Sequence, residues 1–185
     1  MPRQSDIADP GQSSHVQGFA PVAAADARIL VLGSMPGVAS LRQARYYAHP
    51  RNAFWPIAAQ VLGFDAAADY PARLQALQQA GVALWDVLQA CERPGSLDAD
   101  IRADTLVPND FAAFLQAHPR LIRICFNGGK AAALFRRHVL PGLPGLALQY
   151  VDLPSTSPAH AAASFEKKLA VWREALTPPG CARGD

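Results

Sequence analysis

The sequence has few cysteines, few lysines and no long apolar run, and each shortage narrows the class of protein. Its three cysteines (Cys91, Cys125 and Cys181) are odd in number and far apart, which favours neither a disulfide framework nor a Cys-x-x-Cys metal site. No apolar stretch approaches the roughly 20 residues of a membrane span. The N-terminus also lacks a basic segment followed by an apolar run, so we expect no signal peptide and a cytoplasmic location.

The chain does have the composition of one globular domain. Of its 185 residues, 50% are hydrophobic and 17% are charged, a balance that excludes wholesale disorder. We predict a single domain over 15–176, with flexible tails at 1–14 and 177–185 and with order setting in near Phe19.

The charge of the chain is mildly basic and comes mainly from arginine. The net charge is +2, and of 17 basic residues only Lys130, Lys167 and Lys168 are lysines. Arginine favours bidentate contacts with phosphate, and a basic surface suits a polyanionic partner. Codon bias explains the same excess of arginine, so the charge alone does not identify a partner.

Short apolar segments alternate with helical ones through the domain, a pattern typical of a parallel sheet covered on both faces. We expect strands at 27–33, 82–85, 121–126 and 147–151, and helices at 54–62, 71–80, 109–116, 129–138 and 161–176. Asn109 is the expected N-cap of the third helix. The predicted fold is α/β, a three-layer α/β/α sandwich around a central four-stranded, mainly parallel sheet. In such sheets ligands bind outside the carboxyl ends of the strands.

The segment 33–37, Gly-Ser-Met-Pro-Gly, follows the first predicted strand. Small residues let the backbone approach a ligand closely, and successive N–H groups can bind an anion or a carbonyl. A tight turn between strand and helix explains the same residues equally well. The order of the residues is not the Gly-x-Ser-x-Gly of a hydrolase nucleophile.

The densest cluster of aromatic and polar residues is 46–55, Tyr-Tyr-Ala-His-Pro-Arg-Asn-Ala-Phe-Trp. Aromatic rings can stack on a nucleobase, and an Asn amide can both donate to and accept from the base edge. The cluster therefore favours a base-binding pocket that includes Asn52. For Trp55 a position in the core of a helix is the better interpretation.

Polar residues after the remaining strands are candidates for contacts with phosphate. Arg93 and Ser96 lie in the loop 91–98, and the segment 127–130, Asn-Gly-Gly-Lys, opens a helix whose free N–H groups suit an anion. The segment 153–160 places three hydroxyls between two prolines. A solvated loop, a plain turn and a helix cap are the respective structural alternatives.

The strand ends lack the residues of several enzyme classes. Only Asp86 and Asp152 supply carboxylates there, no His, Cys or Glu cluster has the spacing of a metal site, and the sequence has no Gly-x-Gly-x-x-Gly dinucleotide motif. The side chains that the strand ends do supply are amides, hydroxyls, aromatic rings and cations. These groups suit the binding of a neutral base and a phosphate backbone.

Taken together, the segments 33–37, 49–55, 127–130 and 153–159 resemble the uracil-DNA glycosylase superfamily, and in particular its DNA-deoxyinosine (hypoxanthine-DNA) glycosylase branch. The combination, in order and at matching strand ends, is specific, although each piece alone is weak. The resemblance implies a monofunctional DNA glycosylase of base-excision repair. Such an enzyme flips a deaminated base, chiefly hypoxanthine, out of double-stranded DNA and hydrolyses its N-glycosidic bond. We expect a monomer that needs no metal or cofactor and performs no lyase step.

The resemblance also assigns roles to residues. The mismatch-specific thymine/uracil branch has, at the position of Met35, an Asn that positions the attacking water, and the resemblance implies that Asn52 takes over this catalytic role. Phe54 matches the ring that stacks on the flipped base, and the loop 153–159 matches the motif that enters the minor groove. The implied base-binding residues are Gly33, Ser34, Met35, Pro36, Tyr47, Phe54 and Asn127. The implied DNA-binding residues are Arg51, Arg93, Ser96, Lys130, Pro154, Ser155, Thr156, Ser157 and Pro158.

Backbone N–H groups around Ser34, Met35 and Phe54 are candidates for reading the 6-keto oxygen of hypoxanthine. Adenine carries an amino donor in its place, so the exchange would leave polar groups unpaired and would exclude adenine. Two alternatives stay open, namely a glycosylase for uracil in G:U pairs and a non-catalytic α/β module that binds nucleotides or nucleic acid.

Overall fold

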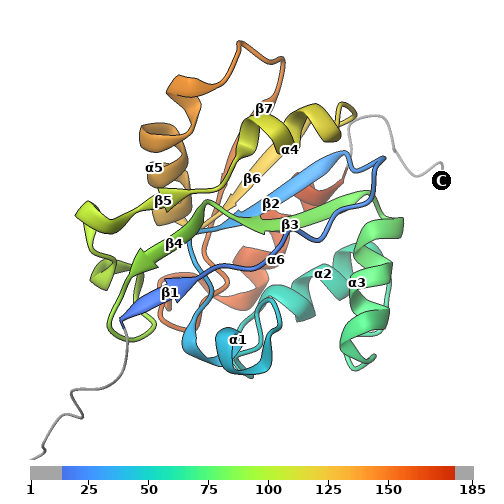
Figure 1. Cartoon of the computed structure of the whole chain (residues 1–185). Helices are drawn as coiled ribbons and strands as arrows, with labels where there is room; N and C mark the ends of the chain where they lie inside the picture. The colour runs from blue at the N-terminus through green and yellow to red at the C-terminus, as the bar shows by residue number, and fades with distance from the viewer. Residues whose placement is uncertain (1–13, 178–185) are drawn as a thin grey trace, which may run out of the picture.

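The computed structural model describes residues 14–177 (Figure 1). The tails predicted at 1–14 and 177–185 lie outside the described residues, apart from Ser14 and Thr177. Within the described part, regular structure begins before Phe19. Strand β1 (His15–Gln17) pairs antiparallel with β4 (Leu88–Glu92).

A four-stranded parallel sheet forms the centre of the molecule, as the sequence predicted. Strands β2 (Ile29–Gly33) and β6 (Arg123–Asn127) are its inner strands, and β3 (Val82–Asp86) and β7 (Gln149–Leu153) are its edges, in the order β3-β2-β6-β7. All three neighbouring pairs are parallel. Every residue of β2 and β3 is buried, which explains why their sequences are apolar apart from Asp86 at the end of β3.

Helices cover both faces of this sheet (Figure 1). One face packs against α2 (Phe54–Leu62), α3 (Tyr70–Gln79) and α6 (Phe165–Leu176), and the other against α4 (Phe111–Ala117) and α5 (Gly129–His138). Within residues 14–177, no helix has both the length and the apolar character needed to cross a membrane.

Alternation along β2 joins the two halves of the core. Ile29 and Val31 belong to the apolar cluster on the side of α2, α3 and α6, whereas Leu30 and Leu32 belong to the cluster on the side of α4 and α5. Because successive side chains of a strand point to opposite faces, one short strand supplies both layers. The predicted three-layer α/β/α sandwich is confirmed.

The sequence did not predict a second, smaller sheet. Strand β4 follows β3 after the single residue Val87 and pairs antiparallel with both β1 and β5 (Val107–Pro108). These strands are short and have no strong apolar period, so pattern reasoning had little to detect. Also unpredicted are helix α1 (Val38–Gln43) and the 3₁₀ turns η1 (Asp98–Asp100), η2 (Ala103–Thr105) and η3 (Leu140–Gly142).

The start of α4 differs by one residue from the prediction. Asp110, and not Asn109, is the N-cap, and its carboxylate accepts a hydrogen bond from the N–H of Ala113 at 3.0 Å. The amide of Asn109 donates instead to the carbonyl of Asp86 at 2.8 Å and ties the loop before α4 to the end of β3. Asn and Asp are equally good caps, so local preference did not separate them.

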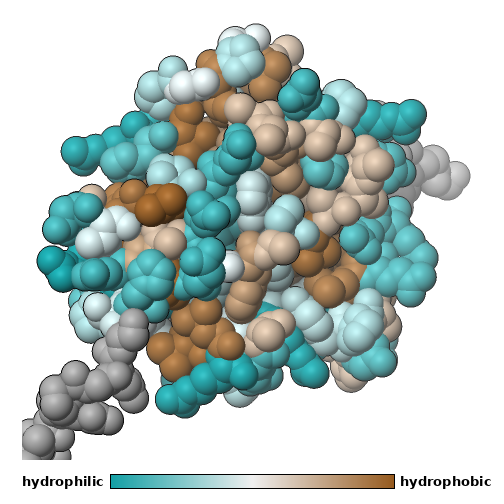
Figure 2. Space-filling view, in the orientation of Figure 1, coloured by the Kyte–Doolittle hydropathy of each residue, from teal (hydrophilic) through white to brown (hydrophobic). Residues whose placement is uncertain are grey.

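The surface carries apolar side chains in small patches. On the face seen in Figure 2, brown apolar patches are interspersed with teal polar ones. The large apolar side chains that are exposed are spread over several segments, namely Leu97, Val107, Leu140, Leu146 and Val171. Apolar residues exposed in this scattered way are ordinary on a protein surface.

Arg123 fastens the last helix to the sheet. Its side chain is buried, and its guanidinium donates to Gln149 Oε1 at 3.0 and 3.1 Å and to the carbonyls of Ala175 and Thr177. The last carbonyls of a helix have no partner within the helix. Arg123, at the first residue of β6, therefore satisfies the end of α6.

Replacing this arginine by an apolar side chain of similar length removes these bonds. We expect Arg123→Met to lower the free energy of unfolding by about 2–3 kcal/mol, because buried carbonyls lose a charged donor. Urea denaturation measures the difference, with the exposed Arg120→Met as the matched control. Equal midpoints for the two variants would contradict the assigned role.

Candidate functional site

A cavity of about 670 Å³ lies at the carboxyl ends of the parallel strands. Its walls come from the segments 33–40, 96–98, 127–130 and 155–160, from residues of the segment 46–52 before α2, and from Asp86 at the end of β3. This is the place that the rule for open α/β sheets predicts.

Most of the predicted site residues meet on this cavity. They are Gly33, Ser34, Met35, Pro36, Tyr47, Arg51, Asn52, Ser96, Asn127, Lys130, Ser155, Thr156, Ser157 and Pro158. The residues Phe54, Arg93 and Pro154 do not line it. Segments more than a hundred residues apart in the sequence thus form one site, because β2, β6 and β7 are neighbours in the sheet.

Asn52 is half-buried on the cavity wall just before α2. Its side-chain oxygen accepts a hydrogen bond from the backbone N–H of Phe54 at 2.9 Å. The backbone N–H of Asn52 donates to the carbonyl of His49 at 2.8 Å. The bond from Phe54 fixes the orientation of the side chain, and the bond to His49 fixes the backbone that carries it. One lone pair of the oxygen and the amide hydrogens remain for a ligand.

The structure corrects the role predicted for Phe54. Its side chain is 0% exposed and packs between Tyr47, at 4.1 Å between stacked ring centroids, and Trp172. Its N–H is bonded to Asn52 and is therefore not free to read a base. Tyr47 covers Phe54 and is, with the more buried Tyr46, an aromatic residue of the cavity wall.

Tyr47 has an unusual backbone conformation. Its φ is 54°, in the left-handed region that bulky residues rarely adopt, and such conformations cluster at functional sites. Burial and the charge of Asp86 raise the pKa of its hydroxyl, with the Asn127 amide acting in the opposite direction. The hydroxyl is buried and keeps its proton, so Tyr47 presents an O–H donor as well as a ring.

The predicted phosphate contact by Arg93 is wrong. The side chain is 2% exposed, and its guanidinium donates to the carbonyl of Pro36 and to that of Gly95 at 2.9 Å. Arg93 ties the loop after β4 to the segment 33–37. Its neighbours Pro, Gly and Ser suggested a solvated loop, and only the packing of two distant segments buries the side chain.

Thr156 is likewise a structural link and not a phosphate ligand. Its side chain is 1% exposed, and it exchanges two hydrogen bonds with the Asn127 amide, at 2.8 Å to its hydroxyl and 2.9 Å from its N–H. Its carbonyl accepts from the N–H of Ala53 at 3.0 Å. Asn127 is thus mostly committed to holding the loops. Pro154 has a similar structural role, since its carbonyl accepts from the Trp172 indole.

Two exposed cations remain at the mouth of the cavity. Arg51 precedes Asn52, and Lys130 is the second residue of α5. Within residues 14–177 neither forms an ion pair, so both are available to phosphate groups. Among the described residues, no three His, Cys, Asp or Glu side chains converge as a metal site would require.

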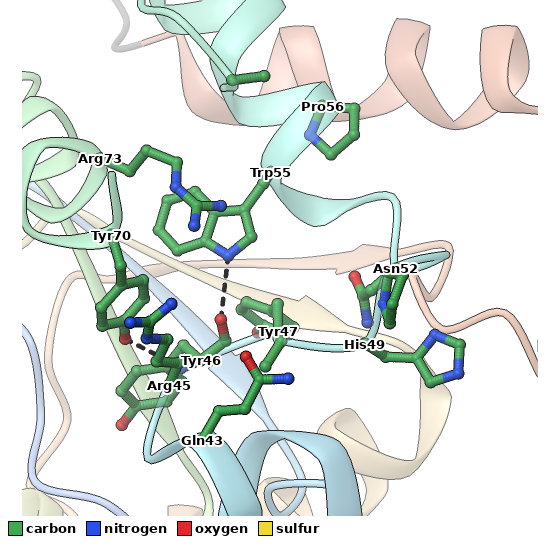
Figure 3. A pocket seen from close by; sticks show the side chains of 13 residues that line it. Gln43, Arg45, Tyr46, Tyr47, His49, Asn52, Trp55, Pro56, Tyr70 and Arg73 are labelled. Atoms are coloured by element: carbon green, nitrogen blue, oxygen red, sulfur yellow. Dashed lines mark hydrogen bonds between the residues drawn. The ribbon is translucent and has the colours of Figure 1, made fainter. Parts of the chain in front are cut away.

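A smaller cavity of about 230 Å³ shares the wall around Asn52 with the first (Figure 3). Arg73 lies over the ring of Trp55 at 4.6 Å, and Arg45 lies over the ring of Tyr70 at 5.5 Å. Trp55 is buried, as expected of a helix core position. No acidic residue lines this cavity, and its arginines extend the cationic surface beside the mouth.

Asp86 is the wall residue to which the sequence assigned no role. It is 4% exposed, and its Oδ2 is buried without a hydrogen-bond partner. Burial first, and then the negative charge of Asp98, raise its pKa to about 7, against the opposing charge of Arg93. The sequence feature that could have drawn attention to Asp86 is a carboxylate at the end of a buried strand, where ligands bind to such sheets.

Comparison with known proteins agrees with this geometry. Residues 20–176 match the model of a family described as the Uracil DNA glycosylase superfamily. The chain belongs to this superfamily, whose members the strand-end motifs resembled.

Individual relatives indicate which branch of the superfamily the chain is similar to. The chain is 34% identical to the hypoxanthine DNA glycosylase of Methanosarcina barkeri, over 86% of this chain and 97% of that protein. It is 35% identical to the hypoxanthine DNA glycosylase of Methanosarcina acetivorans, over 78% and 87%. A solution NMR structure from M. acetivorans, described as a candidate uracil DNA glycosylase, is 32% identical with a TM-score of 0.72, covering 88% and 99%. The resemblance to the hypoxanthine branch is confirmed.

The link through Thr156 gives a prediction that separates its two interpretations. We expect Thr156→Val to lower the free energy of unfolding by about 1–3 kcal/mol, because the Asn127 amide then loses a buried acceptor. The neighbouring Ser157→Ala removes a hydrogen bond that is exposed, at a cost of less than about 1 kcal/mol. Urea denaturation of both variants measures the difference. Unchanged stability with weakened DNA binding in Thr156→Val would instead support a phosphate contact.

Proposed function

We propose that this chain is a monofunctional DNA glycosylase that removes deaminated bases, chiefly hypoxanthine, from DNA by hydrolysing the N-glycosidic bond. The single observation that carries the proposal is the strand-end cavity, which has Asn52 on its wall and Arg51 and Lys130 at its mouth. Relatives named hypoxanthine DNA glycosylase, similar over most of their length, support this choice of base.

The cavity suits a base that has been flipped out of a duplex. Tyr47 offers a ring and a hydroxyl to it. The carbonyls of Gly33 and Ser34 accept from the N–H groups of Val87 and Leu88 at 2.8 and 3.2 Å. Because the peptide unit is planar and trans, the N–H groups of Ser34 and Met35 point the opposite way. They are candidate donors to the 6-keto oxygen, and adenine lacks that acceptor.

Asn52 is the proposed catalytic residue, since the Met35 thioether does not orient water. Its amide holds the attacking water, or the departing purine, at the point where α2 begins. As the bond to the base breaks, the sugar becomes oxocarbenium-like, and the nearby DNA phosphates stabilise its charge. Lys130 is exposed at the mouth, which suits contact with phosphate, and we expect no lyase step.

Uracil is the second candidate base, because the solved relative is described as a candidate uracil DNA glycosylase. A single-turnover assay separates the candidates. Duplexes carrying one deoxyinosine, one deoxyuridine or neither are incubated with the protein and then treated with alkali. We expect strand cleavage at deoxyinosine. Cleavage mainly at deoxyuridine would make uracil, and not hypoxanthine, the main substrate base. Binding without cleavage would indicate a non-catalytic module.

The role of Asn52 is tested by truncation. We expect Asn52→Ala to lower hypoxanthine excision roughly 10²- to 10³-fold, the usual cost of losing one positioned polar group in an active site, with duplex binding retained. The control is Gln60→Ala, which truncates an exposed amide on α2, the helix that Asn52 precedes. An Asn52→Ala protein as active as this control would reject Asn52 as the catalytic residue.

A further inference from the structure

Asp86 has chemistry that the mechanism above does not use. It lies on the cavity wall at the end of β3, and its Oδ2 is buried without a hydrogen-bond partner. Buried polar atoms in native proteins are almost always paired, so an unpaired one that lines a cavity points to a partner supplied by the ligand. Asn52 and the backbone N–H groups can bind the base, but none of them can deliver a proton to it.

The carboxyl group of Asp86 lies directly against the segment that is proposed to read the base. A Cβ on Gly33 would stand 2.5 Å from Asp86 Oδ1 and 3.6 Å from the Tyr47 hydroxyl. The absence of a side chain at Gly33 is what allows this approach. In hypoxanthine, N7 is the acceptor next to O6 on one edge of the ring. A base whose O6 meets the N–H groups of Ser34 and Met35 can therefore turn N7 towards Asp86.

The surroundings of Asp86 favour its neutral form. Asp98 faces it with a second carboxylate, which accepts from the Ser34 hydroxyl at 2.6 Å. The phenols of Tyr46 and Tyr47 lie close enough for their pKa values to respond to its charge. Arg93 is the cation nearby, but it donates to backbone carbonyls, and within residues 14–177 it forms no ion pair with Asp86.

We propose that Asp86 is the general acid of the reaction and donates its carboxyl proton to N7 of the flipped hypoxanthine while the N-glycosidic bond breaks. The inference rests on the proposed function. The electron pair of the C1′–N9 bond goes to the purine, which leaves as neutral hypoxanthine with a proton on N7. Water adds its oxygen to C1′ and releases one proton to solvent, which replaces the proton lost by Asp86. The net reaction consumes one water.

The first test compares pH profiles. Because the pKa of Asp86 is about 7, the single-turnover rate on deoxyinosine should be constant below neutral pH and fall tenfold per unit above it. Asp86→Asn keeps the shape but has no proton to transfer. It should be roughly 10²- to 10⁴-fold slower at pH 6, the usual contribution of a general acid, and should lack this decline. The control Asp152→Asn, at an exposed carboxylate, should keep the wild-type profile.

The second test uses the wild-type protein and so does not depend on the folding of a variant. A duplex with 7-deaza-2′-deoxyinosine has carbon in place of N7 and cannot accept the proton there. We expect it to be bound but cleaved as slowly as Asp86→Asn cleaves deoxyinosine. Cleavage at the deoxyinosine rate would overturn the proposal, as would a wild-type rate and pH profile in Asp86→Asn. A wild-type protein that excises no hypoxanthine would instead reject the proposed function itself.

Discussion

The reciprocal pair of hydrogen bonds between Asn127 and Thr156 is the interaction on which the cavity depends most. It joins the end of β6 to the loop after β7, and the Thr156 carbonyl extends the link to Ala53, beside Asn52. Three segments that are far apart in the sequence are therefore held at fixed distances by one buried threonine. A site built on loops gains its precision from such supporting bonds and not from the residues that touch the ligand.

The charges of the site are arranged by depth. Arg51 and Lys130 are exposed at the mouth, whereas Asp86 and Asp98 stand on the wall behind the segment 33–37. A nucleotide has the matching arrangement, with a charged phosphate outside and a neutral base inside. The Asp98 carboxylate also disfavours a negatively charged group in the inner part, which helps to select a neutral base over a phosphate there.

The sequence predicted the fold well, because the mainly apolar runs at 27–33, 82–85 and 121–126 indicate burial on two faces whatever the rest of the chain does. The strand-end rule then located the cavity. Pattern reasoning was least successful for side chains whose surroundings come from distant segments. Phe54 was assigned to the flipped base but is buried behind Tyr47, and Arg93 was assigned to phosphate but is buried and donates to the Pro36 carbonyl. Asp86 received no role because nothing local shows that its carboxyl group lacks a partner.

The hydrogen bonds that Arg123 makes to the end of α6 also determine at which end of the sheet this helix finishes. Arg123 is the first residue of β6, and the cavity lies beyond the last residue of the same strand. Residue 177 is therefore held near the amino-terminal ends of the parallel strands, at the opposite end of the sheet from the cavity. A reporter or an immobilising surface joined after α6 would leave the cavity facing solution. The same attachment before β1 would pull on a strand whose partner, β4, runs directly into the cavity wall.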